Sequence, residues 1–381
     1  MRKFLCVILS IIFLFGIVSL IACAGGNMNK VTIVDKDLKD YTIVYAKYEY
    51  ESIMEENPTE ASYTDWDFNR LIAEELRDNI KNKFGVELQI KKDTDSTETE
   101  NEILIGKTNR VKLKGVATFT PYDYKVGVTE NKLFFYGGCY GTTYAATNYF
   151  LSYLDGQTDN VNIDESFELQ GTHDLITIAC IGASNTEGYH PQNKFANVKY
   201  WSYPATLQRL NWKTSYVYNF GASGKAMRED DTNPYKNSTQ WSNCKAVAEN
   251  FDHVFIQLGA NDFVRDKTEW SEDKKVTFVN SFNNIISTLN QKNPNIKYTI
   301  LNIWAPATQS YNPRINELLE DCYDSAVSND YNVKYYDLAS SIESSLGRNA
   351  FSSDNLHFSS EGYCALGTLI DEEIFHGIWE E

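Results

Sequence analysis

The stretch "DLITIACIGASNTEG", residues 174–188, indicates the fold of the second half of this chain. Its β-branched and apolar run up to Ile181 predicts a buried strand. The small residues that follow, beginning with Gly182, predict a sharp turn into a helix. Ser184 stands at that turn, where a serine either caps the next helix or presents its hydroxyl for chemistry. Residues elsewhere in the chain distinguish between these two roles.

The same pattern recurs four times after residue 188. The runs are "TSYVYNFG" (214–221), "DHVFIQLG" (252–259), "KYTILNIWAP" (297–306) and "NVKYYDLA" (332–339), with helical spacing between them in segments such as "VTFVNSFNNIISTLNQK" (276–292). This alternation predicts a three-layer α/β/α domain over residues 171–381, with a parallel sheet covered by helices on both faces. Such sheets bind ligands at the carboxyl ends of their strands.

Polar residues follow these predicted strands, as an active site would require. A serine hydroxyl is a poor nucleophile until a base removes its proton, and a histidine serves best near neutral pH. His357 lies three residues after Asp354 in the loop "SSDNLHFSSEGY" (352–363). That spacing lets Asp354 hold the ring of His357 with its other nitrogen toward Ser184. An isolated pair with this spacing is typical of an ordinary turn. The catalytic interpretation of the pair therefore depends on the polar residues at the other strand ends.

Acyl transfer also needs hydrogen-bond donors where negative charge develops on the substrate oxygen. Gly221 allows its backbone N–H to approach closely because it has no Cβ, and the Asn261 side chain supplies an amide donor. The Ser184 N–H completes a predicted three-donor oxyanion hole. Each residue alone is typical of a turn, but their order at successive strand ends favours one shared site.

The blocks "GASNTEG", "NFGASG", "GAND" and "DNLH" closely resemble those of the SGNH, or GDSL-like, hydrolases, over essentially all of residues 171–381. The resemblance implies a flavodoxin-like fold and places the four hallmark residues on Ser184, Gly221, Asn261 and His357. It implies ester hydrolysis through an acyl-enzyme, with no cofactor and no metal. Ala183 departs from the aspartate that many GDSL members have before the nucleophile. Thr186 excludes the Gly-x-Ser-x-Gly elbow of ordinary α/β-hydrolases.

Three further residues are weaker candidates for substrate binding. Tyr189 and His190 follow Ser184 closely, and they either line the cleft or belong to a surface loop. Trp304 follows the fourth strand of the domain, where it either stacks on a sugar or packs in the core beside the cleft.

Residues 31–170 predict a smaller α/β domain. Phe68, Leu71, Ile72, Leu76 and Ile80 keep helical spacing, and Gly85 ends that helix. The segments "EILIGKTNR" (102–110) and "KLFFYGGCYGTTYAATNYFLSYL" (132–154) resemble the small domain that precedes the barrel in bacterial α-glucuronidases and hexosaminidases. The resemblance implies a carbohydrate-handling context. A simple spacer remains the alternative.

The N-terminus predicts export. Arg2 and Lys3 precede a long apolar run, and "LIAC" (20–23) resembles the lipobox of bacterial lipoproteins, which would make residues 1–22 a signal peptide, Cys23 the lipidated residue and 23–30 a linker. An uncleaved membrane anchor is the alternative. Losing those two basic residues would change the net charge from −17 to −19, and so strong a negative charge argues against nucleic-acid binding.

These observations together predict an exported serine esterase, lipid-anchored at the bacterial cell surface, that acts on O-acetyl groups of an acetylated glycan. A lipase or thioesterase of the same fold is one alternative. A non-catalytic glycan-binding lipoprotein is another.

Overall fold

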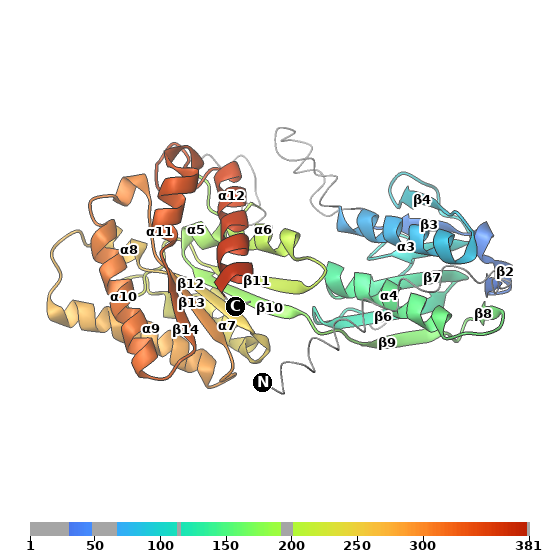
Figure 1. The fold of residues 1–381 in the computed structure, drawn as a ribbon, viewed down its shortest axis with the longest axis horizontal. Helices are drawn as coiled ribbons and strands as arrows, with labels where there is room; N and C mark the ends of the chain where they lie inside the picture. Colours follow the sequence, from blue (N-terminus) through green and yellow to red (C-terminus); the bar gives the residue numbers. More distant parts are fainter. Residues whose placement is uncertain (1–29, 48–66, 113–115, 192–200, 379–381) are drawn as a thin grey trace, which may run out of the picture.

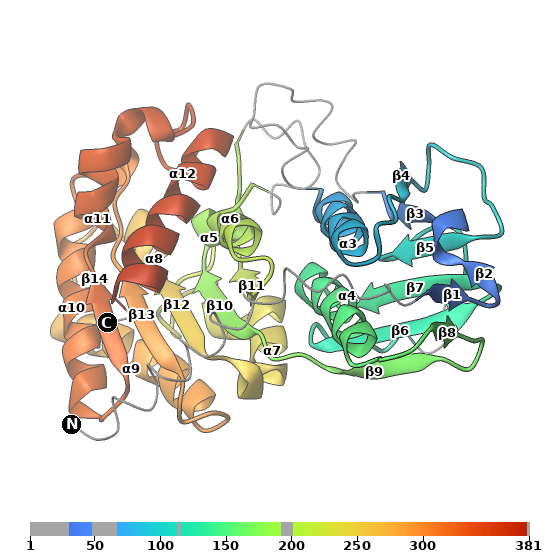
Figure 2. The same ribbon diagram turned by 45° about the vertical axis from the view of Figure 1, so that its right-hand side comes forward.

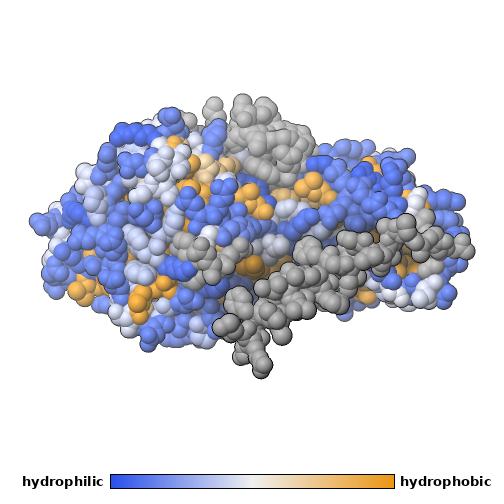
Figure 3. Space-filling view, viewed as in Figure 1, coloured by the Kyte–Doolittle hydropathy of each residue, from blue (hydrophilic) through white to orange (hydrophobic). Residues whose placement is uncertain are grey.

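Two units, joined end to end, make up the described part of the chain (Figure 1). The computed structural model describes residues 30–47, 67–112, 116–191 and 201–378. The expected signal peptide, its lipobox and Cys23 lie outside these ranges. Within them, no helix combines the length and the apolar character needed to cross a membrane. On the face drawn in Figure 3, side chains are mostly hydrophilic and the apolar ones form small separate patches.

The C-terminal unit is built on a five-stranded parallel sheet, as the sequence predicts. Its order is β11-β10-β12-β13-β14. The strands are β10 (Ile176–Gly182), β11 (Ser215–Gly221), β12 (His253–Gln257), β13 (Lys297–Leu301) and β14 (Val333–Tyr336). Gly182 and Gly221 are paired at the carboxyl ends of neighbouring β10 and β11. The turn that carries Ser184 therefore lies beside the loop that follows β11.

Helices cover both faces of this sheet because its strands are apolar on both sides. Ala179 and Ile181 of β10 pack in one core with helices α7, α9 and α10, whereas Ile178 and Cys180 pack in the other with α6, α11 and α12. The helices of the unit are α5 (Ser184–Glu187), α6 (Tyr203–Leu210), α7 (Thr239–Ala246), α8 (Ala260–Arg265), α9 (Glu272–Asn290), α10 (Asn312–Ser328), α11 (Leu338–Ser341) and α12 (Ser360–Ile370).

The N-terminal unit is the smaller α/β domain expected from the sequence. Its main sheet has the order β4-β3-β5-β7-β6-β9, in which β4, β3, β5 and β7 are parallel and β6 runs antiparallel to both neighbours. These strands are β3 (Thr42–Tyr45), β4 (Gln89–Lys92), β5 (Glu102–Ile105), β6 (Asp123–Thr129), β7 (Lys132–Gly137) and β9 (Glu168–Thr172). A second, small sheet contains β1 (Val31–Ile33), β2 (Lys36–Asp37) and β8 (Val161–Ile163).

Two helices, α3 (Phe68–Phe84) and α4 (Tyr140–Asp155), cover one face of the main sheet. The α3 helix ends where the sequence predicts, because Gly85 adopts the left-handed conformation at φ 67° and donates its N–H to Lys81. Strand β9, which ends at Thr172, pairs in the N-terminal sheet, and the chain then continues into β10 of the C-terminal sheet at Ile176.

A tryptophan from the C-terminal unit packs into the N-terminal unit at the junction between them. Trp212, in the loop after α6, is buried in the core of the N-terminal unit, where its ring stacks on Phe68 with centroids 5.0 Å apart. Beside it, Lys213 Nζ lies 2.7 Å from Glu75 Oε2 and 4.3 Å from the centre of the Tyr144 ring. Burial of this tryptophan gives the two units a packed, apolar junction.

Candidate active site

The turn that presents Ser184 depends on the close packing of two glycines against α5. A Cβ on Gly182 would lie 1.9 Å from Thr186 Oγ1, and one on Gly221 would lie 2.0 Å from the Glu187 backbone nitrogen. Only glycine fits at both positions, so the short helix α5 rests directly on the ends of β10 and β11. Ser184 is the first residue of α5 and projects from the edge of the sheet.

A tight loop before α12 presents the histidine. Residues 352–357 form a turn in which Ser352 donates its N–H to the His357 carbonyl at 2.8 Å, and Asn355 adopts a positive φ of 56°. Phe351 and Phe358 pair as an isolated antiparallel bridge on either side of this turn, and their rings stack at 4.3 Å. These two buried aromatic rings therefore fix the position of the turn that carries His357.

Ser184, His357 and Asp354 form a continuous hydrogen-bonded relay. His357 Nε2 lies 2.9 Å from Ser184 Oγ, and His357 Nδ1 lies 2.6 Å from Asp354 Oδ2. Both distances are within the range of good hydrogen bonds. The three side chains thus have the arrangement in which a serine can lose its proton to an imidazole oriented by a carboxylate.

Asp354 is held in its ionised form. Partial burial alone would raise the pKa of this carboxyl, but hydrogen bonds from the backbone N–H groups of His357 and Leu356, the His357 ring and the Ser352 hydroxyl bring the pKa down to about 2. The Oδ1 atom accepts the two backbone N–H groups at 3.0 Å, which leaves Oδ2 for the imidazole. A carboxylate fixed in this way both orients and stabilises a protonated ring.

Asn185 and Tyr363 position the relay, and the sequence analysis did not single out either residue. Asn185 Nδ2 donates to the Leu356 carbonyl at 3.3 Å, joining the serine turn to the histidine loop. The single hydrogen of the buried Tyr363 hydroxyl is shared between the Tyr189 carbonyl at 2.7 Å and Asn185 Oδ1 at 3.1 Å. Asn185 follows the nucleophile directly, but only the fold reveals its partners 171 and 178 residues away.

Within the described residues, two of the three expected oxyanion donors keep a hydrogen without an acceptor. The Ser184 N–H belongs to the first residue of a helix, where no intrahelical acceptor exists. Asn261, on α8, donates one amide hydrogen to the Lys225 carbonyl at 2.9 Å. Because a side-chain amide has two hydrogens, this bond orients the group and leaves the second hydrogen available.

Gly221, the third expected donor, is engaged elsewhere. Its N–H donates to Asn219 Oδ1 at 2.9 Å, so a role in the oxyanion hole would require this bond to be given up. Gly224, three residues later and not singled out from the sequence, has a φ of +70° and no acceptor for its N–H within the described ranges. The adjacent Lys225 carbonyl contacts the Asn261 amide. Of these two glycines, Gly224 is therefore the one whose N–H has no acceptor among the described residues.

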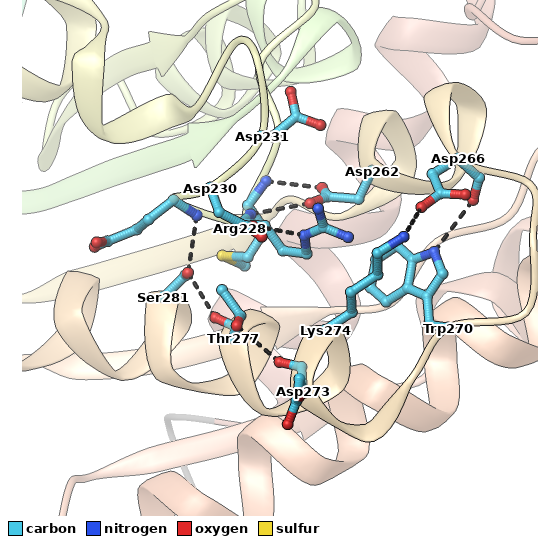
Figure 4. A network of polar contacts seen from close by, with 12 residues as sticks. Arg228, Asp230, Asp231, Asp262, Asp266, Trp270, Asp273, Lys274, Thr277 and Ser281 are labelled. Carbon is cyan, nitrogen blue, oxygen red and sulfur yellow. Dashed lines mark hydrogen bonds and ion pairs between the residues drawn. The ribbon is translucent and has the colours of Figure 1, made fainter.

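Asp262 holds the loop after β11 in place (Figure 4). Its buried carboxylate accepts the backbone N–H groups of Met227 and Arg228 at 2.8 and 2.9 Å. The Arg228 guanidinium pairs with Asp230 at 2.9 Å and lies 4.8 Å from the centre of the Trp270 ring. Desolvation raises the pKa of Asp262 to about 6, against the lowering effect of these two N–H bonds. The aspartate next to Asn261 thus fixes the segment that contacts the Asn261 amide.

The weaker candidates fall into two groups. The ring of Tyr189 packs on His357 with centroids 4.6 Å apart. Burial lowers the pKa of His190, against the raising effect of the Asp354 and Glu361 charges. Both residues thus lie near the relay. Trp304 packs on Phe351 at 5.4 Å and lines a separate hollow with acidic and amide residues. Among the described residues, no group of three or more His, Cys, Asp and Glu side chains is arranged to hold a metal ion.

Comparison with known families accounts for this geometry. A family model described as GDSL-like lipase/acylhydrolase matches residues 178–370, half of the chain, and that range contains every residue of the relay. The chain belongs to the GDSL-like lipase/acylhydrolase family.

The chain is also similar to individual proteins. It is 39% identical over 89 residues to an acetylxylan esterase of Xylanibacter ruminicola, a match that spans 23% of this chain and 17% of that protein. Among solved structures it is similar to a carbohydrate acetylesterase from Sinorhizobium meliloti, with 16% identity, coverage of 53% of this chain and 99% of that one, and a TM-score of 0.38. A lipase/acylhydrolase from Enterococcus faecalis has 22% identity, coverage of 52% and 95%, and a TM-score of 0.38.

Proposed function

We propose that this GDSL-like hydrolase is a serine esterase that removes O-acetyl groups from a carbohydrate. The observation that supports the proposed reaction is the hydrogen-bonded relay from Ser184 through His357 to Asp354. The similarity to an acetylxylan esterase over 89 residues supports an acetylated polysaccharide such as xylan as the substrate.

In the first half of the proposed reaction, Ser184 Oγ attacks the acetyl carbonyl carbon while its proton passes to His357 Nε2. The carbonyl oxygen becomes negatively charged and accepts hydrogen bonds from the Ser184 N–H, the Asn261 amide and the Gly224 N–H. The bond to the sugar oxygen then breaks, and that oxygen takes the proton from His357. The products of this half are the free sugar hydroxyl and an acetyl ester on Ser184.

In the second half, His357 removes a proton from a water molecule, whose oxygen attacks the acetyl-serine carbonyl. The tetrahedral intermediate collapses, the Ser184 oxygen regains a proton from His357, and acetate leaves. Asp354 remains ionised throughout and stabilises the positively charged imidazole in each half.

Acetate release from acetylated glycans tests this proposal directly. Acetylated xylan and other acetylated polysaccharides are compared with p-nitrophenyl acetate, butyrate and longer-chain esters, with the Ser184→Ala chain as the blank. We expect acetyl esters to be preferred and acetate to be released from at least one glycan. Preference for long acyl chains would instead assign a lipase or thioesterase, and the absence of turnover on every ester would contradict the enzymatic proposal.

We further propose that the protein is exported and anchored to the bacterial surface through a lipid on Cys23. The apolar run of residues 1–22 and the "LIAC" stretch support this proposal. Metabolic labelling with a fatty acid should mark the membrane-bound protein, and Cys23→Ala should abolish the label. Labelling that persists in Cys23→Ala would contradict the proposal.

A further inference from the structure

A pocket separate from the Ser184 site lies between the two units, on the side of β11 away from β10. Its volume is about 560 Å³, within the usual range for small-molecule sites. The C-terminal unit contributes residues of α6 and β11, and the N-terminal unit contributes the ends of β3, β5 and β7 and the starts of α3 and α4. Figure 2 shows α3 and α4 facing α6 and β11 across this junction.

The sheet of the N-terminal unit places this pocket where α/β proteins commonly bind ligands. Its parallel strands have the order β4-β3-β5-β7, so the direction of chain progression reverses between β3 and β5. Ligands of open parallel sheets bind outside the carboxyl ends of the strands at such a reversal. Ala46 and Lys47 after β3, and Gly106 and Lys107 after β5, line the pocket at this point.

The charge of the pocket wall is opposite to that of the whole protein. The chain has 52 acidic and 35 basic residues, yet the described residues that line the pocket include Lys47, Lys107 and Arg209 and no acidic residue. Two helices, α4 and α6, also begin at this wall, with the uncharged N-cap residues Cys139 and Ser202. Their positive ends add to the field of the basic side chains, whereas the α3 start is capped by the Asp67 carboxylate.

The pocket also offers groups that suit a polyol. Asn69 is 6% exposed and donates Nδ2 to the Ala46 carbonyl at 3.3 Å, so its Oδ1 is left as an acceptor. A Cβ on Gly106, which has a φ of +73°, would lie 2.7 Å from that oxygen. Tyr136, Tyr140 and Tyr216 line the same pocket and supply ring faces beside polar hydroxyls.

The pocket is coupled to the relay through Asn219. This lining residue donates to Ser202 Oγ at 3.1 Å and accepts the Gly221 N–H at 2.9 Å. It also reaches the carbonyl of Glu187, the last residue of the four-residue helix that begins with Ser184. One short helix, with a rise of about 1.5 Å per residue, thus separates the pocket wall from the nucleophile.

We propose that this pocket binds a carboxylate-bearing sugar residue of the same polysaccharide whose acetyl esters are hydrolysed at Ser184. Lys107 and the helix starts attract the carboxylate, Asn69 accepts a sugar hydroxyl, and tyrosine rings contact the apolar face of the sugar. The identity of the sugar chain rests on the proposed function, whereas the anionic preference rests on the pocket alone.

Calorimetric binding of two non-acetylated probes to the full chain tests the proposal without hydrolysis. The probes are xylotriose and xylotriose that carries one glucuronic acid, so they differ by the acidic substituent. At low ionic strength we expect the acidic probe to bind at least about fivefold more tightly. Lys107 is exposed, and Lys107→Gln should remove about three- to fivefold of that preference, the range of an exposed charge pair.

Two control variants sharpen the test. Lys292→Gln makes the same charge change at an exposed site beyond the end of α9 and should leave both affinities unchanged. Ala205→Phe fills the pocket from a half-buried position on α6 and should weaken both probes.

Equal affinity for the two probes would overturn the proposal, and so would an equal effect of Lys107→Gln and Lys292→Gln. Inorganic phosphate that binds as tightly as the acidic probe would also overturn it, by making the pocket a simple anion site. None of these results would alter acetate release, so failure of this proposal remains distinguishable from failure of the proposed esterase function.

Discussion

The Nε2 atom of His357 lies 2.9 Å from the Oγ atom of Ser184, although 173 residues separate the two in the chain. The contact forms because the β10 turn and the loop before α12 meet at the carboxyl edge of one parallel sheet. Asn185 bridges the same two segments through the Leu356 carbonyl. The relay therefore depends on the whole C-terminal unit being folded.

Replacing the nucleophile should abolish activity without unfolding the protein. Ser184→Ala removes the Oγ atom while the backbone of α5 stays packed on Gly182 and Gly221. We expect ester hydrolysis to fall by about 10³-fold or more. Steady-state assays with p-nitrophenyl acetate measure the loss, and circular dichroism monitors folding. A folded variant that keeps a tenth of the wild-type rate would exclude Ser184 as the nucleophile.

Asp354 should stay ionised throughout the pH range of the assay. The pKa of this carboxyl is depressed to about 2, so the carboxylate is ionised from pH 4 to 9, and its stabilising contribution is lost only as the pH falls toward 2. Carbon-13 NMR of the Asp354 carboxyl measures its ionisation directly. A chemical-shift change that reports proton uptake by Asp354 above pH 4 would contradict the assignment.

Asp354→Asn should lower kcat by about 10⁴-fold, because an amide favours the wrong tautomer of the imidazole. Ser352 and the backbone N–H groups of Leu356 and His357 can still bond the amide oxygen, so the loop should stay folded. The kcat of the folded variant is measured against the wild type. Full activity in Asp354→Asn would remove this carboxylate from the mechanism.

Asn261→Ala should lower kcat more than it raises KM, because an oxyanion donor acts mainly on charge that develops in the transition state. The expected loss is roughly 10²- to 10³-fold in kcat. Separate determination of kcat and KM on an acetyl ester provides the measurement. An unchanged kcat with a raised KM would show that Asn261 contacts the substrate in its ground state instead.

The neighbouring Asp262 should matter for stability. Asp262→Asn replaces one of two carboxylate oxygens that accept backbone N–H groups with a donor, which leaves a buried N–H unpaired. We expect the free energy of unfolding to fall by about 1–3 kcal/mol. Asp266→Asn, which loses only a partly exposed pair with Lys274, is the matched control and should have little effect. Equal losses in denaturant unfolding of the two variants would contradict the positioning role.

The junction between the units should depend on Trp212. Trp212→Ala would leave a cavity against Phe68 and Tyr144 and should cost about 3–5 kcal/mol. Leu210→Ala, at an exposed position on the same segment, serves as the control. We expect calorimetry to resolve two separate transitions only in Trp212→Ala. A single transition at the wild-type temperature would show that the units are joined by other contacts.

Much of the fold could be predicted from local patterns. The apolar runs that end at Gly182, Gly221 and Gly259 report buried parallel strands, because backbone preference and burial act over only a few residues. The helix that ends at Gly85 was predictable for the same reason. Ser184, Asp354 and His357 were also identifiable, because few residue types can serve as nucleophile, orienting carboxylate and base, and because motif order is a property of sequence.

Which hydrogen-bonding groups and side chains are available for catalysis depends on the tertiary structure and could not be predicted from the sequence. Gly221 and Gly224 look alike in "NFGASG", yet the Asn219 side chain occupies the N–H of Gly221 and leaves that of Gly224 without an acceptor in the described part of the chain. Trp212 lies in the C-terminal half of the sequence but packs in the N-terminal core. Hydrogen bonds and burial depend on partners far away in the chain, so no local pattern contains them.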